Sequence, residues 1–357
     1  MTRPDVPEVA WFAALCDDDY ELLGVEDPAL RSSWPHCRDI TLAADRNGYD
    51  NILLPSGYAL GIDSVTFAAA VATLLDDLRL LVAVRMGELV VPQLARQLAT
   101  LDHLLDGRLT INIISSDVPG ETLPSGPRYR RTREQMRALR TLLDGAPLEL
   151  RGDFVDLAID APRIAREGRG CPPLYFGGFS PDAKRTAAEE ADVFLTWPDT
   201  VASVGGTVEE MAALAAGCGR ELRFGLRTHV IVRETESEAM DAARHLVSAL
   251  DDDIGAAIRS RSLDTASAGV ARQTELRDGA DGDGFAEPGL WTGIGRARSG
   301  AGAAIVGDPD QVRAKLDAYR DVGIDAFILS GYPHLAECER FARLVLDDLP
   351  HAPLFAR

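Results

Sequence analysis

Apolar, β-rich runs alternate along the chain with longer segments of helical periodicity. Eight runs are predicted as strands: 9–15, 51–56, 78–85, 109–115, 173–178, 192–197, 224–232 and 326–331. Amphipathic helices lie between them, for example at 38–48, 91–107, 130–145 and 181–191. Eight strand-then-helix alternations predict an α/β fold, a parallel (β/α)8 TIM barrel; a doubly wound open sheet is the competing fold.

The alternation breaks once, before the last strand, in a long insertion at residues 252–325. Its part at 279–302 is rich in glycine, alanine and aspartate and carries Arg296 and Arg298. Long irregular segments inside compact domains are usually functional loops or disordered. We therefore expect residues 279–302 to form a mobile lid over the barrel mouth.

The insertion ends in a predicted helix at 308–323, with Asp308 as its N-cap before Pro309. Barrels of this type use about 250 residues or more as one domain. Residues 1–357 are therefore predicted to form a single domain.

Charge narrows the classes of partner. The chain carries 56 acidic and 37 basic residues, a formal net charge of −19, which repels nucleic acid and anionic membranes.

The chain has no apolar run of about 18 residues and no signal pattern, so a cytoplasmic protein is expected. Five scattered cysteines without a C-x-x-C pair predict neither disulfides nor a metal site. An anionic ligand would need concentrated arginines or helix N-termini.

An arginine and a histidine share one face of the predicted strand 224–232. Residues two apart in a strand point the same way, so Arg227 and His229 face one side and Leu226 and Val230 the other. A buried arginine is costly unless it is paired, which suggests a ligand or a carboxylate partner. The alternative is a structural ion pair at the barrel end.

A phosphate site is suggested where the run 173–178 ends. Gly177 and Gly178 allow close backbone approach, and Ser180 opens a helix whose free N–H groups suit phosphate. A capped tight turn without a ligand is the alternative. The segment 293–302 only partly matches G-x-G-x-x-G, so no dinucleotide site is expected there.

Three further candidate site residues lie at or just after the carboxyl ends of predicted strands, at the face where barrel active sites form. Trp197 ends the run 192–197 and could form the wall of a flat cofactor site or fill the rim. Tyr332 and His334 follow the last strand and belong either to a site or to a turn.

Taken in order, several segments closely resemble the alkanesulfonate monooxygenases of the bacterial luciferase-like family, through nearly the whole chain. These segments are ARQLATLDHLLDGRLTINIIS, PPLYFGG, DVFLTW, FGLRTHVIVRETESEA, LWTGIGRARSGAGAAIVGDPDQV and DAFILSGYPHL. A-R-Q-x-A-T-L-D is general to the superfamily. FGLRTHVIVRE, the Gly-Ala-Gly stretch and LSGYPHL are specific to the alkanesulfonate branch.

The resemblance implies a two-component monooxygenase. It implies reduced FMN supplied by a separate NAD(P)H-dependent flavin reductase, and O2 that oxygenates the carbon bearing a sulfonate, with release of an aldehyde and sulfite. The implied partners are a small anionic substrate, O2 and the reductase. A homodimer or homotetramer is expected.

The resemblance also implies roles for individual residues. The positions that align with the family's active-site residues are Trp197, Arg227, His229, Arg298, Tyr332 and His334. Arg227 would hold an anion or an oxygen species and His229 would handle protons; Arg298 and His334 would also contact substrate. Flavin contacts are expected from Ser115, Tyr129, Gly177, Gly178, Phe179, Ser180 and Tyr332, with Tyr129 and Ser180 at the phosphate.

Departures from the family pattern concern the pocket wall. Cys16, followed by three aspartates, replaces a histidine, and Leu60 replaces a cysteine, so both are expected to contact substrate. Phe179 replaces a small serine beside the phosphate. The loop after the fourth strand is shortened, although Arg128 and Tyr129 remain.

Three readings of the activity stay open. The first is cleavage of an organosulfonate. The second keeps the fold but acts on another organosulfur, amine or carbonyl compound, or uses a deazaflavin for hydride transfer. The third is a non-catalytic barrel that stores flavin or pairs with a catalytic chain, against which the joint presence of Arg227, His229, Arg298 and Tyr332 argues. The sequence does not name the substrate, the reductase or the number of subunits.

Overall fold

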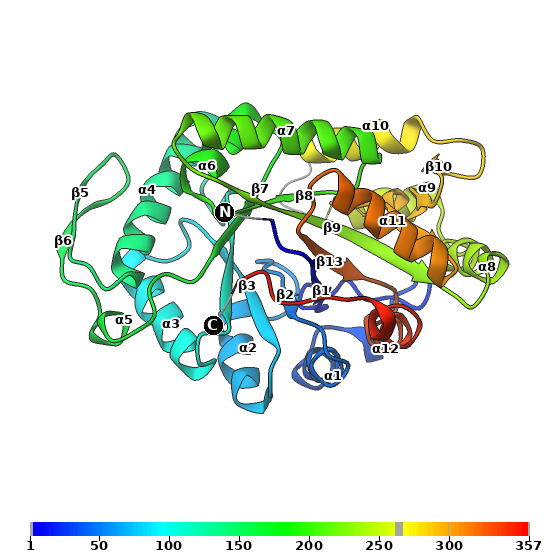
Figure 1. The fold of residues 1–357 in the computed structure, drawn as a ribbon, viewed down its shortest axis with the longest axis horizontal. Helices are drawn as coiled ribbons and strands as arrows, with labels where there is room; N and C mark the ends of the chain where they lie inside the picture. The colour runs from blue at the N-terminus through cyan, green and yellow to red at the C-terminus, as the bar shows by residue number, and fades with distance from the viewer. Residues whose placement is uncertain (1–2, 261–266, 299, 356–357) are drawn as a thin grey trace.

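The computed structural model describes residues 3–260, 267–298 and 300–355. At its centre, eight parallel strands pair in a closed ring, because β1 pairs with both β2 and β13 and β8 pairs with β9 (Figure 1). The strands are β1 (Glu8–Phe12), β2 (Asn51–Leu54), β3 (Arg79–Arg85), β4 (Leu109–Ile114), β7 (Leu174–Gly177), β8 (Val193–Thr196), β9 (Arg223–Val232) and β13 (Ala326–Ser330). The predicted (β/α)8 barrel is confirmed, and closure excludes the open sheet.

Helices surround this ring and bury their apolar faces against it (Figure 1). They are α1 (Trp34–Arg46), α2 (Ser64–Val71), α3 (Val91–Leu104), α4 (Ser125–Leu143), α6 (Pro181–Glu190), α7 (Val201–Gly217), α11 (Pro309–Asp321) and α12 (His334–Leu344). The predicted N-cap of α11 is present, because the Asp308 carboxylate accepts from Gln311 N–H and the Gln311 side chain accepts from Asp308 N–H.

The barrel interior is closed at the amino ends of the strands. Apolar side chains such as Phe12, Leu81 and Tyr175 fill the ring, and the C-terminal Phe355 packs edge-on against Tyr175. The buried Glu8 carboxylate accepts from Tyr175 OH and from Leu354 N–H. Any ligand must therefore enter from the carboxyl ends of the strands.

The insertion 252–325 has more regular structure than the sequence suggested. After α8 (Glu236–Leu246) come α9 (Asp252–Arg259), α10 (Ala268–Asp278), β10 (Phe285–Glu287), β11 (Leu290–Trp291) and β12 (Ala304–Gly307). β12 pairs in parallel with the outer end of β9, from His229 to Val232, and continues the sheet beyond the barrel. Trp291, Ile294 and Ala297 are buried. Residues 261–266 and 299 lie outside the described part, and closure of the lid 279–302 stays a prediction.

The remaining elements are peripheral. A hairpin of β5 (Leu148–Arg151) and β6 (Asp156–Ile159), with α5 (Arg163–Arg166), lies across the barrel from α8, α9 and β10 (Figure 1). Short 3-10 turns are η1 (Pro28–Leu30), η2 (Ala72–Leu74), η3 (Gly293–Arg296) and η4 (Leu346–Asp348). In the described part of the chain, no helix is both long and apolar enough to cross a membrane.

Candidate active site

Two adjoining cavities open at the carboxyl ends of the barrel strands. One has a volume of about 490 Å³ and the other about 290 Å³. Trp197, which follows β8, and Ile114, at the end of β4, line both. Because they share these two side chains, the cavities form one site with two compartments, called here the large and the small compartment.

One end of the large compartment suits a phosphate or another anion. The first residues of α4 and α6 meet there, through Ser125, Arg128 and Tyr129 on one side and Ser180 on the other. Two helix N-termini therefore direct their positive ends toward the same space. Arg128 Nε is buried and has no hydrogen-bond partner among the described residues. This end offers donors to an anion.

Gly178 allows this close approach. Its φ is +152°, a conformation that residues with side chains rarely adopt. A Cβ there would lie 2.6 Å from the Ala183 Cβ and 3.7 Å from the Tyr129 hydroxyl. A larger residue would disturb both α6 and the space beside Tyr129.

Arg227 also lines the large compartment. Its Nη1 donates to the Thr228 carbonyl at 2.7 Å and its Nη2 to Ser330 Oγ at 2.8 Å, and its guanidinium lies 4.3 Å from the centre of the Phe12 ring. No ion pair to Arg227 is formed within the described chain, so the structural ion pair is not observed. Burial, with a contribution from Arg298, lowers the Arg227 pKa to about 9, which keeps the guanidinium charged at pH 7.

His229, two residues further along β9, lines neither compartment. Its Nδ1 is 2.8 Å from Ser330 Oγ, and its ring stacks on Tyr332 with centroids 5.1 Å apart. Ser330 Oγ also accepts from Arg227 Nη2, so this hydroxyl connects the guanidinium to the His229 ring. Burial and the nearby arginines hold the His229 pKa well below 6.5, so the ring is neutral at pH 7.

Arg298 connects the insertion to the small compartment. Its Nη1 donates to Asp18 Oδ2 at 2.6 Å and to Tyr332 OH at 2.7 Å. Burial alone would lower the Arg298 pKa, but Tyr332 and Asp18 outweigh it and raise the pKa above its ordinary value. Burial raises the Tyr332 pKa as well, so the phenol stays protonated. Arg298 is thus a cation that is already paired within the protein.

Cys16 and Leu60, which the sequence predicts as substrate contacts, both line the small compartment, and their contact with a substrate stays a prediction. Burial raises the Cys16 pKa to about 12, against the opposing effect of Arg298 and Arg85, so the thiol is not ionised at neutral pH. Its chemistry there is that of a small, neutral wall residue.

His334 is placed differently from the sequence-based expectation of a substrate contact. It is fully buried, with Nδ1 3.0 Å and its backbone N–H 2.9 Å from Asp19 Oδ1, and it lines neither compartment. Asp19 Oδ2 also contacts His36 Nε2 at 2.9 Å. Burial raises the Asp19 pKa, but the interactions with His334 and His36 outweigh it, and the net effect lowers the pKa. This arrangement fixes the ring of His334 beside Tyr332.

The structure thus brings most predicted site residues together. The large compartment collects Ser115, Tyr129, Gly177, Gly178, Phe179, Ser180, Trp197 and Arg227. The small one collects Cys16, Leu60, Trp197, Arg298 and Tyr332. Residue-by-residue reasoning gave no role to Arg85, Arg128 or Asp18, which also line these cavities. Arg85 ends a predicted strand at its carboxyl end, which is a weak signal because arginines at a solvated rim share it.

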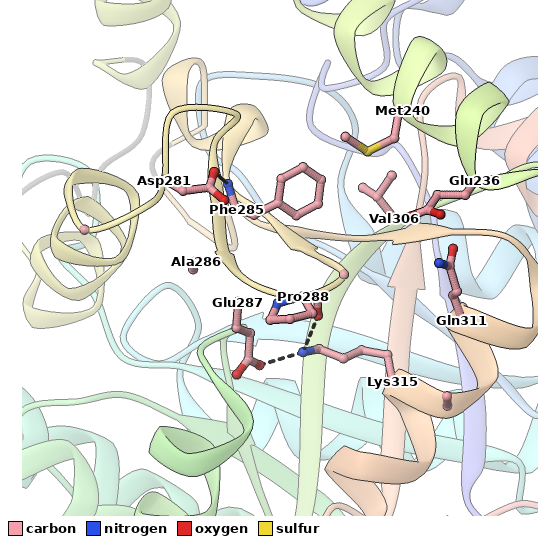
Figure 2. Close-up of a pocket in the computed structure, with 13 residues that line it drawn as sticks. Glu236, Met240, Asp281, Phe285, Ala286, Glu287, Pro288, Val306, Gln311 and Lys315 are labelled. Carbon is pink, nitrogen blue, oxygen red and sulfur yellow. Dashed lines mark hydrogen bonds and ion pairs between the residues drawn. The ribbon is translucent and has the colours of Figure 1, made fainter.

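A third hollow, of about 800 Å³, lies outside the barrel beside α8, β10 and α11 (Figure 2). Glu236, Asp281 and Glu287 give it a negative lining. Lys315, which also lines it, donates to Glu287 Oε1 at 2.6 Å and to the Pro288 carbonyl at 3.0 Å (Figure 2). Because this cation is already paired, the hollow suits an anion poorly, and the barrel mouth remains the candidate site.

Comparison with solved structures gives the same fold. A riboflavin lyase superposes with a TM-score of 0.78 at 14% identity, covering 99% of this chain and 94% of that protein. An EDTA monooxygenase from Chelativorans superposes with a TM-score of 0.76 at 16% identity, covering 99% and 96%. At these identities the likeness supports the barrel architecture alone.

Sequence comparison gives closer relatives. A sulfoquinovose monooxygenase of Novosphingobium aromaticivorans is 60% identical over 354 residues, 97% of this chain and 98% of that protein. One of Agrobacterium fabrum is 48% identical over 355 residues, 98% of this chain and 92% of that protein. Residues 19–326 match the model of the luciferase-like monooxygenases. This chain belongs to the luciferase-like monooxygenase family.

Proposed function

We propose that this chain is an FMN-dependent monooxygenase that uses O2 to cleave a sulfonated sugar, sulfoquinovose, to an aldehyde and sulfite. The observation that carries the proposal is the pairing of an anion-suited large compartment with a small compartment lined by arginine and aspartate. The substrate name comes from the two relatives that are 60% and 48% identical over nearly the whole chain.

The large compartment suits FMN. Its volume of about 490 Å³ lies within the range of cofactor pockets. Arg128, Tyr129 and Ser180 would hold the phosphate at the N-termini of α4 and α6, and Trp197 and Arg227 would border the ring system. Reduced FMN supplies the electrons that activate O2 when it is bound.

The protein's own groups supply charge and positioning around the reacting centre. Arg227 places a fixed positive charge in the compartment that Trp197 also lines, and its partners Thr228 and Ser330 are neutral, so this charge remains available to an oxygen anion. His229 holds Ser330 and stacks on Tyr332. Tyr332 presents a protonated phenol next to Arg298, from which a proton could be donated.

The small compartment suits a compact, polar substrate better than a long alkyl chain. Its lining includes four charged side chains, those of Asp17, Asp18, Arg85 and Arg298. Tyr58 and Leu60 line it as well. Sugar hydroxyls would bond to the carboxylates, and a sulfonate would bond to guanidinium. Delivery of reduced FMN by a separate flavin reductase, and a homodimer or homotetramer, are further parts of the proposal.

The test is sulfite release. Protein, FMN, NADH and a flavin reductase would be mixed in air with sulfoquinovose, with hexanesulfonate or with no sulfonate, and sulfite measured. We expect sulfite from sulfoquinovose and none when the reductase or O2 is left out. Sulfite from hexanesulfonate alone would move the substrate class to alkanesulfonates. If no sulfonate releases sulfite and a reduced deazaflavin is oxidised instead, the proposal is wrong.

A further inference from the structure

Arg85 at the end of β3 lines the small compartment with part of its guanidinium unpaired. Its side chain is only 4% exposed, and its Nε lies 3.0 Å from Glu88 Oε1. Nη2 donates weakly to the Ser56 carbonyl at 3.4 Å, and Nη1 has no hydrogen-bond partner among the described residues. A buried cationic donor without an acceptor is costly, which indicates that a ligand supplies one.

Arg298, the arginine that sequence reasoning assigned to the substrate, has no nitrogen that is both buried and without a partner among the described residues. Its Nη1 already bonds to Asp18 and to Tyr332. A sulfonate that approached Arg298 would have to compete with the Asp18 carboxylate 2.6 Å away. Of the two arginines in this compartment, Arg85 is therefore the one with a buried nitrogen that lacks an acceptor within the described chain.

A free acceptor lies in the same compartment. Asp18 Oδ2 is engaged by Arg298, whereas Asp18 Oδ1 is buried and has no partner among the described residues. An ionised carboxylate oxygen accepts hydrogen bonds and cannot donate them. Its complement is a hydroxyl group of a ligand.

The two unpaired atoms define what fits. A hydroxylated sulfonate carries an anionic oxygen for Arg85 Nη1 and a hydroxyl donor for Asp18 Oδ1, whereas an alkanesulfonate satisfies only the first. We propose that Arg85 is the main anchor of the substrate's sulfonate and that Asp18 selects substrates with a hydroxyl group. This inference rests on the proposed function and assigns specificity within the same site.

The experiment measures affinity apart from turnover. Dissociation constants for sulfoquinovose, hexanesulfonate and inorganic sulfate would be determined anaerobically on protein saturated with reduced FMN. The variants are Arg85→Gln, Arg85→Lys and Asp18→Ala, and thermal unfolding verifies that each is folded. Inorganic sulfate probes the anchor even if neither organic sulfonate is a substrate, so failure of the proposed function and failure of this inference are distinguishable.

Arg85→Gln should weaken all three ligands by a similar factor of about 10- to 100-fold, because it removes a charge-assisted hydrogen bond to a group that they share. Arg85→Lys should retain part of the affinity, and none of the variants should change the affinity for FMN. Asp18→Ala should lower the preference for sulfoquinovose over hexanesulfonate about 10-fold. Asp18→Ala also removes the carboxylate partner of Arg298. If that loss changes the affinity for both sulfonates by the same factor, the ratio of the two affinities stays unchanged.

Two results would overturn the inference. In the first, Arg85→Gln binds sulfate and both sulfonates within twofold of the unmodified protein, while Arg298→Gln does not. In the second, Asp18→Ala leaves the preference between the two sulfonates unchanged. If Arg85→Gln is unfolded, Arg85→Lys decides: unchanged affinities for all three ligands would exclude the forked guanidinium contact.

Discussion

At the scale of single residues, the surroundings of an arginine determine what it can do. Arg227 has neutral partners, Arg298 is paired with Asp18, and Arg108 donates to the Leu75, Leu78 and Leu105 carbonyls. The first is available to a developing negative charge, the second is held by the protein, and the third supports the loops that lead into β3 and β4. The same substitution should therefore have different effects at these positions.

Arg227→Ala should lower kcat/KM for sulfite release by about 100-fold or more, because it removes a fixed charge from the reacting compartment. The fold should persist, since the side chain lines a cavity. Arg108→Ala is the matched control, and it should lower the Tm while leaving kcat/KM of the folded protein unchanged. Steady-state kinetics and thermal unfolding of both variants test this. Unfolding of Arg227→Ala with unchanged specific activity would instead assign it a structural role.

His229 should make stability depend on pH. Burial holds its pKa in the folded state well below the ordinary value of 6.5. Below pH 6.5 the unfolded chain therefore binds a proton that the folded protein does not, and the free energy of unfolding falls by up to about 1.4 kcal/mol per pH unit. The pKa of Asp19 is also lowered, so its contribution to the free energy of unfolding is lost only below pH 3.8. Between pH 7 and 5 the Tm should fall, and His229→Asn should reduce this slope. Parallel slopes in the two proteins would contradict the assignment.

The sequence predicted which residues lie at the site better than it predicted what each of them contacts. Arg227 was recognisable because a cation inside an apolar strand is unusual. Arg85 was not, because an arginine at the end of a strand is equally common at a solvated rim. His334 was expected at the substrate, but Asp19, 315 positions away in the chain, holds it in the packed interior. Such long-range partners leave no mark in local periodicity.

At the scale of elements, the helix N-termini of α4 and α6 carry the cofactor part of the proposal. Arg128→Gln and Tyr129→Phe should each weaken FMN binding about 10-fold, because each removes a donor from the space between the two helix ends. Riboflavin, which lacks the phosphate, is the control ligand and should bind both variants as it binds the unmodified protein. Fluorescence titration with the two flavins gives both affinities. Equal losses for FMN and riboflavin would show that these side chains contact the ring system instead.

The segment 279–302 should respond to ligands. Arg298 attaches it to Asp18 and Tyr332, which lie in other loops at the barrel mouth. Trypsin cleavage after Arg298 requires this contact to open, so reduced FMN with sulfoquinovose should slow cleavage. Arg298→Ala should release hydrogen peroxide in place of sulfite, because an open site admits water. Cleavage at an unchanged rate, together with full coupling in the variant, would exclude a lid.

The sequence predicted the barrel strands, which are long apolar runs, and missed the short strands of the insertion. All eight barrel strands were predicted, because each is an apolar run that both neighbours and helices bury. β10 and β11 span 3 and 2 residues, and glycines surround them, so nothing in their composition separates them from a loop. They form because β12 extends the sheet along the outer half of β9. This support comes through β12 from β9, where His229 pairs with Ala304, 75 positions later in the chain, and not from their own sequence.

At the scale of the whole molecule, a chain of net charge −19 binds anions at local concentrations of positive charge. If the proposed function holds, the overall field would oppose the approach of FMN and of a sulfonate, whereas the helix ends and arginines would act over short distances. Salt distinguishes the two effects. The screening length falls from about 30 Å at 0.01 M to about 8 Å at 0.15 M ionic strength, which weakens the long-range repulsion more than contacts inside the cavities.

Raising the ionic strength from 0.01 to 0.15 M should therefore increase the association rate constant of FMN severalfold and leave its dissociation rate constant nearly unchanged. Stopped-flow fluorescence measures both rate constants, and riboflavin, which carries no phosphate, should show no increase. Arg128→Gln should associate more slowly than the unmodified protein at both ionic strengths. If the association rate constant of FMN falls as salt is added, the positive potential of the barrel mouth extends into solvent and steers anions in. The net charge would then not govern the encounter.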